Sequence, residues 1–232
     1  MATRGVLVLL ASGFWGRLAA QVGHPPDHSP YHDVRVGSAI EFTGGYLSGS
    51  RGVVGVGPSD GDIFGVRYSK ALGGVLAVTI GLADGLTSRY VIDPTKDSST
   101  RTTGPANTSI VVADLGMQVF LTGGKSWHGL IPSFGFSGGL AYSGRAPGDT
   151  SQYTFGTKAT LEPELGLRWY VAPRLTLRAG AKLVLWRLSY PLEYHVAPTL
   201  CTSGCTSVIP VSQSLAQWTA HPWLSLGVGW TF

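Results

Sequence analysis

Long two-residue alternation is the feature that most constrains how this chain can fold. Between Lys158 and Trp169 the even positions are Lys, Thr, Glu, Gly and Arg, whereas the odd positions are mostly Ala, Leu and Trp. A period of two residues places successive side chains on opposite faces of a β-strand. The segment is also longer than an average strand of about five or six residues. The pattern therefore predicts a long strand with one apolar face and one polar face.

The same pattern recurs along the chain, and short turns alternate with long loops between its segments. Eight strands are predicted, at about residues 38–48, 62–70, 75–90, 109–122, 129–143, 154–171, 174–190 and 216–232. Beyond the N-terminal segment the chain shows no helical period of adequate length and no run of about 18 apolar residues, the length at which a transmembrane helix is inferred. We therefore expect an all-β chain that forms an up-and-down antiparallel sheet.

Composition indicates the environment of this sheet. Charged residues make up only 13% of the chain although 44% of it is hydrophobic, whereas a soluble domain carries about 25% charged residues. Within lipid every backbone N–H and C=O must be paired inside the protein, so a sheet there closes on itself. An even number of strands, with short turns at one end and long loops at the other, is typical of outer-membrane barrels. The sequence predicts an eight-stranded antiparallel transmembrane β-barrel with both termini in the periplasm.

Aromatic residues near the ends of the predicted strands support this placement. Trp and Tyr are enriched where a membrane protein meets the lipid–water interface. The residues expected to form the two interfacial girdles are Tyr46, Tyr90, Tyr142, Trp169, Trp218 and Trp230.

The N-terminal residues carry the signals of export. Residues 1–20 combine a positive start at Arg4 with an apolar run and end in two alanines, which is typical of a secretory signal peptide. Residues 21–37 are Pro-rich and polar and are expected to form a periplasmic N-terminal linker. Residues 38–232 then form the barrel domain, and the expected location is the bacterial outer membrane.

Three histidines of the linker recur every four residues. His24, His28 and His32 would align on a helix, but the prolines among them argue against one. A disordered tail is favoured over metal capture, which stays open, and no metal site is assigned.

Cys201 and Cys205 are the two cysteines of the chain. An exported chain enters an oxidising compartment, in which neighbouring cysteines form disulfides. A zinc site would need further ligands, and only His195 is close in sequence. We therefore expect a local Cys201–Cys205 disulfide.

Polar residues on the inward faces form the candidate interior site. An eight-stranded barrel is just wide enough for its side chains to fill, so a polar and largely plugged lumen is expected. The expected network consists of Glu41, Arg67, Asp114, Gln118, Glu162, Glu164, Arg168, Arg178, Lys182 and His221. Its four acids balance its four bases, as a buried site of low dielectric constant requires. A salt-bridge plug that fixes strand register is favoured over an ion gate or a path for small solutes.

The hairpin formed by the sixth and seventh predicted strands limits the pairing inside this network. Its turn lies at Ala172-Pro173. Counting back from the turn places Lys182 opposite Glu162 or Glu164, and the same count places Arg178 opposite Arg168 or Gly166.

An enzymatic site is not expected. Nucleophilic catalysis needs a nucleophile, a base and an orienting group within hydrogen-bond reach. His195 lies in the same loop as Ser203 and Ser207, and Ser126 lies near His128, but no catalytic spacing links them. No cofactor is expected, and the dispersed bases do not indicate a nucleic-acid partner.

The last strand carries a family likeness. Leu224, Leu226, Val228, Trp230 and Phe232 alternate up to the C-terminal residue. With the signal peptide and the eight alternating segments, this ending resembles the small outer-membrane β-barrel superfamily of the OmpA, OmpX and OmpW type. The resemblance covers residues 38–232 and implies that the terminal strand is an assembly signal read by the barrel-assembly machinery. It does not imply an activity, because such folds host many functions.

The expected function is therefore that of a non-enzymatic outer-membrane barrel. It would serve envelope integrity, surface interaction, or narrow passage of a small or hydrophobic solute. Expected partners are outer-membrane lipids and lipopolysaccharide, with a surface ligand at the long loops, and a monomer is expected. The alternative is a barrel enzyme, a deacylase or acyltransferase, that modifies outer-leaflet lipids.

Overall fold

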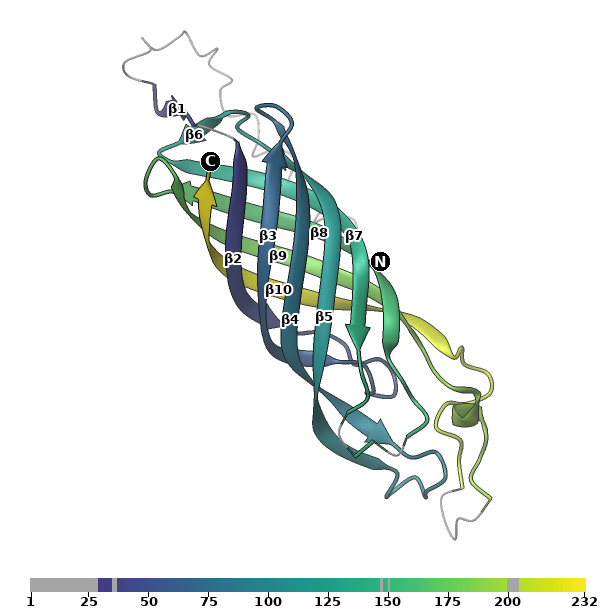
Figure 1. Cartoon of the computed structure of the whole chain (residues 1–232). Coiled ribbons are helices and arrows are strands. Elements are labelled where there is room, and N and C mark those ends of the chain that lie inside the picture. Colours follow the sequence, from purple (N-terminus) through teal and green to yellow (C-terminus); the bar gives the residue numbers. More distant parts are fainter. Residues whose placement is uncertain (1–28, 35–36, 147, 150, 200–204) are drawn as a thin grey trace, which may run out of the picture. The chain divides into compact units, whose positions relative to one another are not determined.

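Eight long strands form a closed antiparallel barrel in the computed structural model, which describes residues 29–34, 37–146, 148–149, 151–199 and 205–232 (Figure 1). The strands are β2 (Ser38–Leu47), β3 (Ser59–Ala71), β4 (Leu76–Ile92), β5 (Thr102–Phe120), β7 (Leu130–Ser143), β8 (Gly156–Tyr170), β9 (Leu175–Ser189) and β10 (Ala216–Thr231). Each pairs with the next, and β10 also pairs with β2. The all-β, up-and-down barrel predicted from the sequence is confirmed.

The strands are staggered as in other small barrels. Following paired residues from Leu47 on β2 through Trp223 on β10 and once round the sheet leads to Ala71 on β3. The backbone N–H of Ala71 donates to the carbonyl of Gly37, beside the start of β2. The register is thus displaced by ten residues around eight strands. Such a stagger tilts the strands by about 35–45° and leaves an interior that side chains can fill.

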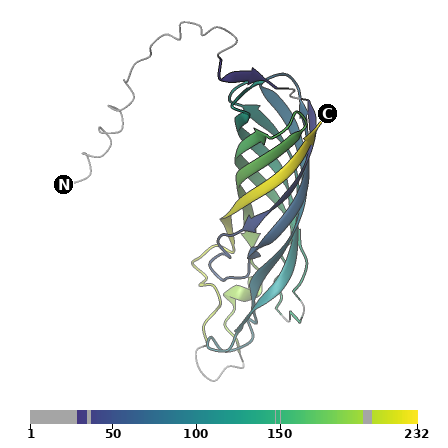
Figure 2. The same cartoon turned by 90° about the vertical axis from the view of Figure 1, so that its left-hand side faces the viewer.

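The two ends of the barrel differ. Residues 72–75 and 171–174 form short turns at one end, the short-turn rim, where the backbone N–H of Ser38 also donates to the carbonyl of Phe232 at 3.1 Å. Long connections form the opposite end, the long-loop rim (Figure 2). The loop predicted from Asp93 to Thr108 is shorter than expected, because residues 102–108 extend β5 and pair with β4.

Two short strands lie outside the barrel wall. β1 (Tyr31–Asp33) pairs antiparallel with β6 (Lys125–Trp127), which belongs to the connection between β5 and β7. The expectation of a wholly disordered linker is therefore wrong for β1, whose backbone is held by the edge of β6. The signal peptide predicted at residues 1–20, together with His24 and His28, lies outside the described residues.

Helical structure is scarce in the part of the chain that the structure describes. A 3-10 helix, Leu192–His195, lies between β9 and β10. None of the helices among the described residues is long and apolar enough to cross a bilayer.

The outer wall of the barrel is apolar along most of its length. Outward positions of every barrel strand carry exposed Leu, Val, Ile or Phe side chains, and aromatic residues lie toward both rims. Five of the six aromatics predicted for the girdles are exposed, namely Tyr46, Tyr142, Trp169, Trp218 and Trp230. Tyr90 is the exception: it packs close to Gly55 of the first long loop, with the Arg51 guanidinium 5.6 Å from its ring centre. A loop thus covers the face that Tyr90 was expected to present to lipid.

The interior is layered. The prediction of a polar lumen is wrong for the half nearest the long-loop rim, which is apolar. Near the long-loop rim, apolar residues of the strands pack against apolar residues of the loops. This apolar layer includes Leu47, Ile63, Ile110, Val112, Val184, Trp186, Leu188 and Trp223 from strands and Val56, Tyr153, Phe155, Tyr194 and Ile209 from loops. The polar network lies in the middle, and a small cluster around Phe120 and Ile131 lies near the short-turn rim.

Candidate functional site

Glu41 on β2 is the centre of the interior network. Its Oε1 accepts from Nη2 of Arg168 at 2.6 Å, and its Oε2 accepts from Nη1 of Arg178 at 3.0 Å. The side chain has no exposed surface. Charge-assisted bonds of this length are the strong class of hydrogen bond in proteins, so Glu41 joins β2 to β8 and β9 across the lumen.

Glu164 extends the network to β3. Its Oε1 accepts from Nη2 of Arg178 at 2.6 Å, and its Oε2 lies 2.8 Å from Nη1 of Arg67. Arg178 therefore bridges Glu41 and Glu164. The result is an alternating chain of charges that ties β8, β2, β9 and β3 together.

Lys182 forms the second part of the network. Its Nζ lies 2.9 Å from Oδ2 of Asp114 and 2.7 Å from Oε2 of Glu162. Glu162 also accepts from the Thr160 hydroxyl at 2.6 Å. The Lys182 ammonium lies 5.0 Å from the ring centre of Trp223, so Lys182 lies where the polar layer meets an apolar layer toward the long-loop rim.

The register explains these pairings. Lys182 lies opposite Glu164 but binds Glu162, its diagonal neighbour, while Arg178 lies opposite Arg168. The repulsion between the two facing guanidiniums is compensated, because both donate to the Glu41 carboxylate on β2. All eight charged members expected for the network are buried and ion-paired in the described structure.

The two remaining members of the expected network contact hydroxyl groups in the described structure. Gln118 donates to the Ser133 hydroxyl at 2.6 Å. His221 is buried in the apolar layer, where its ring stacks on Trp186 at 3.9 Å and its Nε2 is 3.0 Å from the Thr219 hydroxyl. The inward position of His221 was predictable from alternation, but its apolar surroundings were not.

The cavity found within the polar layer has room for little more than one water molecule. This cavity, lined by Arg67, Asp114 and Lys182 among others, measures about 20 Å³. One water molecule needs about 10–15 Å³ measured in this way. The polar layer and the apolar layer thus form two successive obstructions along the barrel axis.

The long loops form a structured unit, the loop head, which packs against the apolar layer at the long-loop rim. Arg89 of β4 makes a fully buried ion pair with Asp149 of the β7–β8 loop, and its guanidinium lies 5.3 Å from the ring centre of Tyr153. Burial raises the pKa of Tyr190 to about 12 and raises the pKa of Tyr194 well above its usual range. No sequence pattern indicated the Arg89–Asp149 pair, because 60 residues separate its members.

A pocket of about 260 Å³ opens between three loops of the loop head. Its lining residues are Pro94, Thr95, Gln152, Glu193, Val196, Ala197, Pro198 and Thr199. Apolar walls with a few polar groups are the usual composition of a small-ligand site.

The residues considered for catalysis do not form a triad among the described residues. His195 Nε2 is 3.1 Å from the carbonyl of Gln213. Ser126 donates to the carbonyl of His32, and the ring of His128 packs edge-on against Trp127. Ser203 and Cys201 lie outside the described residues, so the Cys201–Cys205 disulfide stays a prediction. Within the described ranges no group of three His, Cys, Asp or Glu could hold a metal ion.

The residues of the predicted assembly signal lie on one face of β10. Leu224, Leu226, Val228 and Trp230 are exposed on the outer wall, and so is Phe232 just beyond the strand. β10 pairs with β9 on one side and β2 on the other. The last strand of the chain is therefore the one that closes the barrel.

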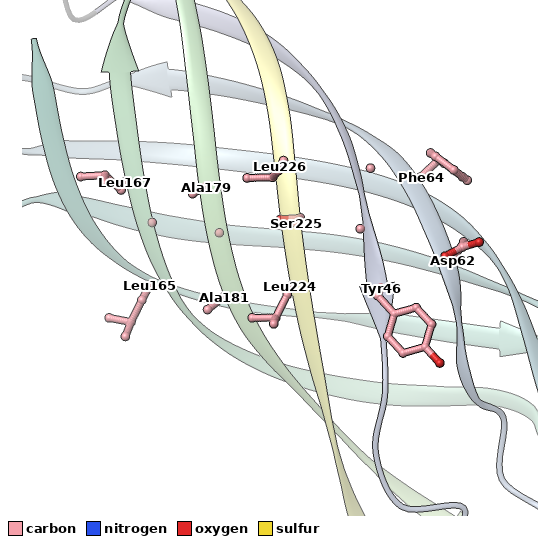
Figure 3. A pocket seen from close by; sticks show the side chains of 14 residues that line it. Tyr46, Asp62, Phe64, Leu165, Leu167, Ala179, Ala181, Leu224, Ser225 and Leu226 are labelled. Atoms are coloured by element: carbon pink, nitrogen blue, oxygen red, sulfur yellow. The ribbon is translucent and has the colours of Figure 1, made fainter.

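The outer wall carries a groove of about 950 Å³ across β8, β9, β10, β2 and β3 (Figure 3). Leu165 and Leu167 line its β8 side, and Tyr46 and Phe64 line its other side. The outward positions between them carry little side chain, because they are Ala179 and Ala181 on β9 and Gly44 on β2. Leu224 and Leu226 of β10 form a ridge along the middle.

One position in the wall breaks the hydrogen-bonded ladder. The pairing of β8 with β9 includes Leu161 with Leu185 and Glu164 with Lys182, but not the two pairs between them. Pro163 lies in this gap and has no N–H to donate. An outer-wall pocket of about 300 Å³ reaches the gap and touches Glu164 and Lys182 as well as Pro163.

Comparisons with known proteins agree with this architecture. No family model and no curated protein matches the chain. The outer membrane protein OprG from Pseudomonas aeruginosa is 12% identical with a TM-score of 0.53, and the match covers 87% of this chain and 97% of OprG. Neisserial surface protein A is 12% identical with a TM-score of 0.54, and the match covers 84% of this chain and 97% of that protein. The chain therefore shares the barrel fold of these two outer-membrane proteins.

Proposed function

We propose that this protein is a non-enzymatic barrel of the bacterial outer membrane whose closed body holds a loop head at the cell surface. The observation that carries the proposal is the filled interior: an ion-paired layer lies below an apolar layer that includes residues of the long loops. A barrel filled in this way supports loops rather than conducting ions. Rigid scaffolds that present loops are a common arrangement for binding.

The membrane location is supported by the wall and by the structural neighbours. Outward apolar side chains surround the barrel, and aromatic residues lie toward both rims, as lipid-exposed strands require. OprG is by name an outer membrane protein and NspA a surface protein. With both ends of the barrel domain on the periplasmic side, the loop head faces the outside of the cell.

Conductance tests the closed interior. Purified protein inserted into a planar lipid bilayer is expected to give no sustained ion current, because the ion-paired layer and the apolar layer follow one another along the barrel axis. Insertion is checked in parallel by the shift in gel mobility between heated and unheated samples. Sustained current from verified barrels would contradict the plug.

A loop exchange tests the surface role. Cells that display the intact protein are compared with cells in which residues 196–208 are replaced by a short Gly-Ser turn, and adhesion to abiotic surfaces and to other cells is measured. The proposal expects adhesion to fall while the amount of inserted barrel is unchanged. Equal adhesion of the two strains would favour a role in envelope integrity, measured as detergent sensitivity of a strain that lacks the protein.

A second candidate function rests on the gap at Pro163. A small or hydrophobic solute would move between lipid and the polar layer through the wall beside Pro163, rather than along the barrel axis. Uptake of a fluorescent apolar dye by vesicles that contain the protein would then fall in Pro163→Val, which restores the missing donor. The same uptake in both proteins would eliminate this candidate.

A further inference from the structure

Two acidic residues lie on the lipid-facing side of the barrel wall. Asp62 on β3 and Asp84 on β4 are both exposed on the outer face. Asp62 lies opposite Leu86 and Asp84 opposite Phe64, so the two carboxylates are diagonal neighbours. Neither belongs to any of the ion pairs found among the described residues. Two like charges are thus diagonal neighbours on the outer face, and neither has a cation partner among the described residues.

The level of these acids in the wall is set by their neighbours. Asp62 lies directly opposite Tyr46, one of the aromatic residues toward the long-loop rim. A charge on the lipid face is costly at the middle of a bilayer and costs little near the interface. Ionisable residues in membrane-spanning segments are nevertheless rare and commonly mark a functional site.

Asp62 lies at one end of the outer-wall groove, and Asp84 is its diagonal neighbour on β4. Asp62 and Tyr46 line the groove at this end, and Figure 3 shows both beside the apolar residues. Toward the short-turn rim a further depression of about 510 Å³ continues over Phe42, Gly44 and Leu177. The leucine ridge of β10 divides the surface into one channel over the alanines of β9 and another over Gly44 of β2. A two-chain lipid would fit this surface, with its headgroup at the polar end and one acyl chain in each apolar channel.

We propose that this groove binds one outer-leaflet lipid whose headgroup carries an ammonium. Its acyl chains lie in the two channels, where they gain contact with apolar side chains. Its ammonium lies between the carboxylates of Asp62 and Asp84 and supplies the cation that the described chain lacks. A headgroup with phosphate as its only charge is disfavoured by the same two carboxylates. The inference rests on the proposed outer-membrane location.

Native mass spectrometry of the inserted protein tests the headgroup. The protein is reconstituted with equal amounts of phosphatidylethanolamine and phosphatidylglycerol that share the same acyl chains, in the presence of a chelator of divalent cations. Phosphatidylethanolamine is expected to be retained several-fold over phosphatidylglycerol. Asp62→Asn combined with Asp84→Asn is expected to abolish the preference, whereas the loop substitution Asp97→Asn keeps it.

A second pair of variants tests the channels. Ala181→Leu fills the channel over β9 and is expected to lower the retention of both lipids by several-fold. Ala113→Leu is the matched control, because Ala113 is also exposed on the outer face, on β5, and lines neither groove. Equal losses in the two variants would overturn the assignment of the acyl chains to this groove.

The remaining outcomes separate this inference from the proposed function. Equal retention of the two lipids by the wild type, or a preference that survives in the double Asn variant, would overturn the ammonium site and leave the barrel in its membrane. Retention of phosphatidylglycerol that appears only when Mg²⁺ is added would replace the ammonium by a bridging cation and also overturn it. Failure of the protein to insert into the vesicles would count against the proposed function itself.

Discussion

At the scale of single residues, each buried charge of the interior network is compensated by an ion-pair partner. Glu41 has two guanidinium partners, and Lys182 has two carboxylate partners. A buried pair contributes little net stability relative to apolar residues of similar size, but removal of one partner leaves an uncompensated charge. The sequence identified these eight residues through their inward parity and balance. The hairpin count limited Lys182 to Glu162 or Glu164, and it binds Glu162. The other partners were not identified, because most of those pairs cross the lumen between strands distant in sequence.

Substitution of Glu41 tests this compensation. Glu41→Gln is expected to destabilise the barrel by about 3–5 kcal/mol, because two buried arginines lose their shared carboxylate. The midpoint of guanidinium unfolding, followed by tryptophan fluorescence in vesicles, measures the change. Asp97→Asn in a loop is the control and is expected to leave the midpoint unchanged. A wild-type midpoint for Glu41→Gln would show that Glu41 does not hold the two arginines.

Tyr190 in the loop head predicts a dependence on alkaline pH. Burial raises its pKa to about 12, whereas the unfolded chain titrates near 10. The folded state therefore keeps this proton after the unfolded state has lost it, and the stability falls as pH rises from about 10 to 12. Tyr190→Phe is expected to make this fall shallower in unfolding experiments across that range. An identical slope in both proteins would contradict the assignment.

At the scale of elements, the strands follow the sequence pattern where their outer face is apolar and exposed. Long alternation predicted all eight strands, and most ends agree within a few residues. Three strand segments were missed for a common reason. β1 and β6 have three residues each, and residues 102–108 at the start of β5 contain polar residues and a proline, so all three resemble loops. β1 and β6 pair with each other, and residues 102–108 pair with β4. Pairing with a neighbour overrode local propensity there.

The gap in the β8–β9 ladder makes a prediction about one of these elements. Pro163→Val is expected to restore one backbone hydrogen bond to β9 and to stabilise the barrel by about 0.5–1.5 kcal/mol. Pro222→Val on β10 is the matched control, because the β9–β10 pairing is continuous through Pro222. Unfolding midpoints in vesicles compare the two variants. Equal gains would locate the effect in side-chain packing rather than in the ladder.

The final strand carries a prediction about assembly. Phe232→Ser is expected to lower the amount of barrel inserted in cells, because Phe232 belongs to the assembly signal predicted from the sequence. The refolded variant is expected to unfold with nearly the wild-type midpoint, since Phe232 is exposed at the rim. Unchanged insertion in cells would count against the signal, and Thr231→Ser provides a control at the neighbouring inward position.

At the scale of the whole molecule, barrel and loop head share one core. Tyr153 and Phe155 of the β7–β8 loop are buried with Trp186 of β9, and Phe155 packs edge-on against Trp186 at 5.4 Å. The Arg89–Asp149 pair holds the same loop to β4. The loop head is therefore fixed by contacts inside the barrel, which favours a preorganised binding surface.

Limited proteolysis tests this coupling. Chymotrypsin is expected to spare residues 144–155 in the wild type, because the side chain of Tyr153 is buried. Arg89→Met removes the ion pair and is expected to expose the loop and increase the cleavage rate severalfold. Arg51→Met breaks a partly exposed pair with Asp60 instead and serves as the control. Equal cleavage of all three proteins would mean that Arg89 does not fix the loop.

By itself, the sequence determined the closed eight-stranded barrel and the two faces of its strands. The two faces follow from a period of two residues, which can be read from neighbouring residues. Closure follows from the need to pair every backbone group in lipid, which applies to each strand whatever its partner. The tertiary structure decided which charges pair, that an apolar layer fills the lumen near the long-loop rim, and how the loops pack on that layer. Runs such as Leu183-Val184-Leu185-Trp186 are apolar on both faces, so alternation cannot show that their inward side meets folded loops. Such contacts join residues far apart in sequence, and only closure of the barrel brings them together.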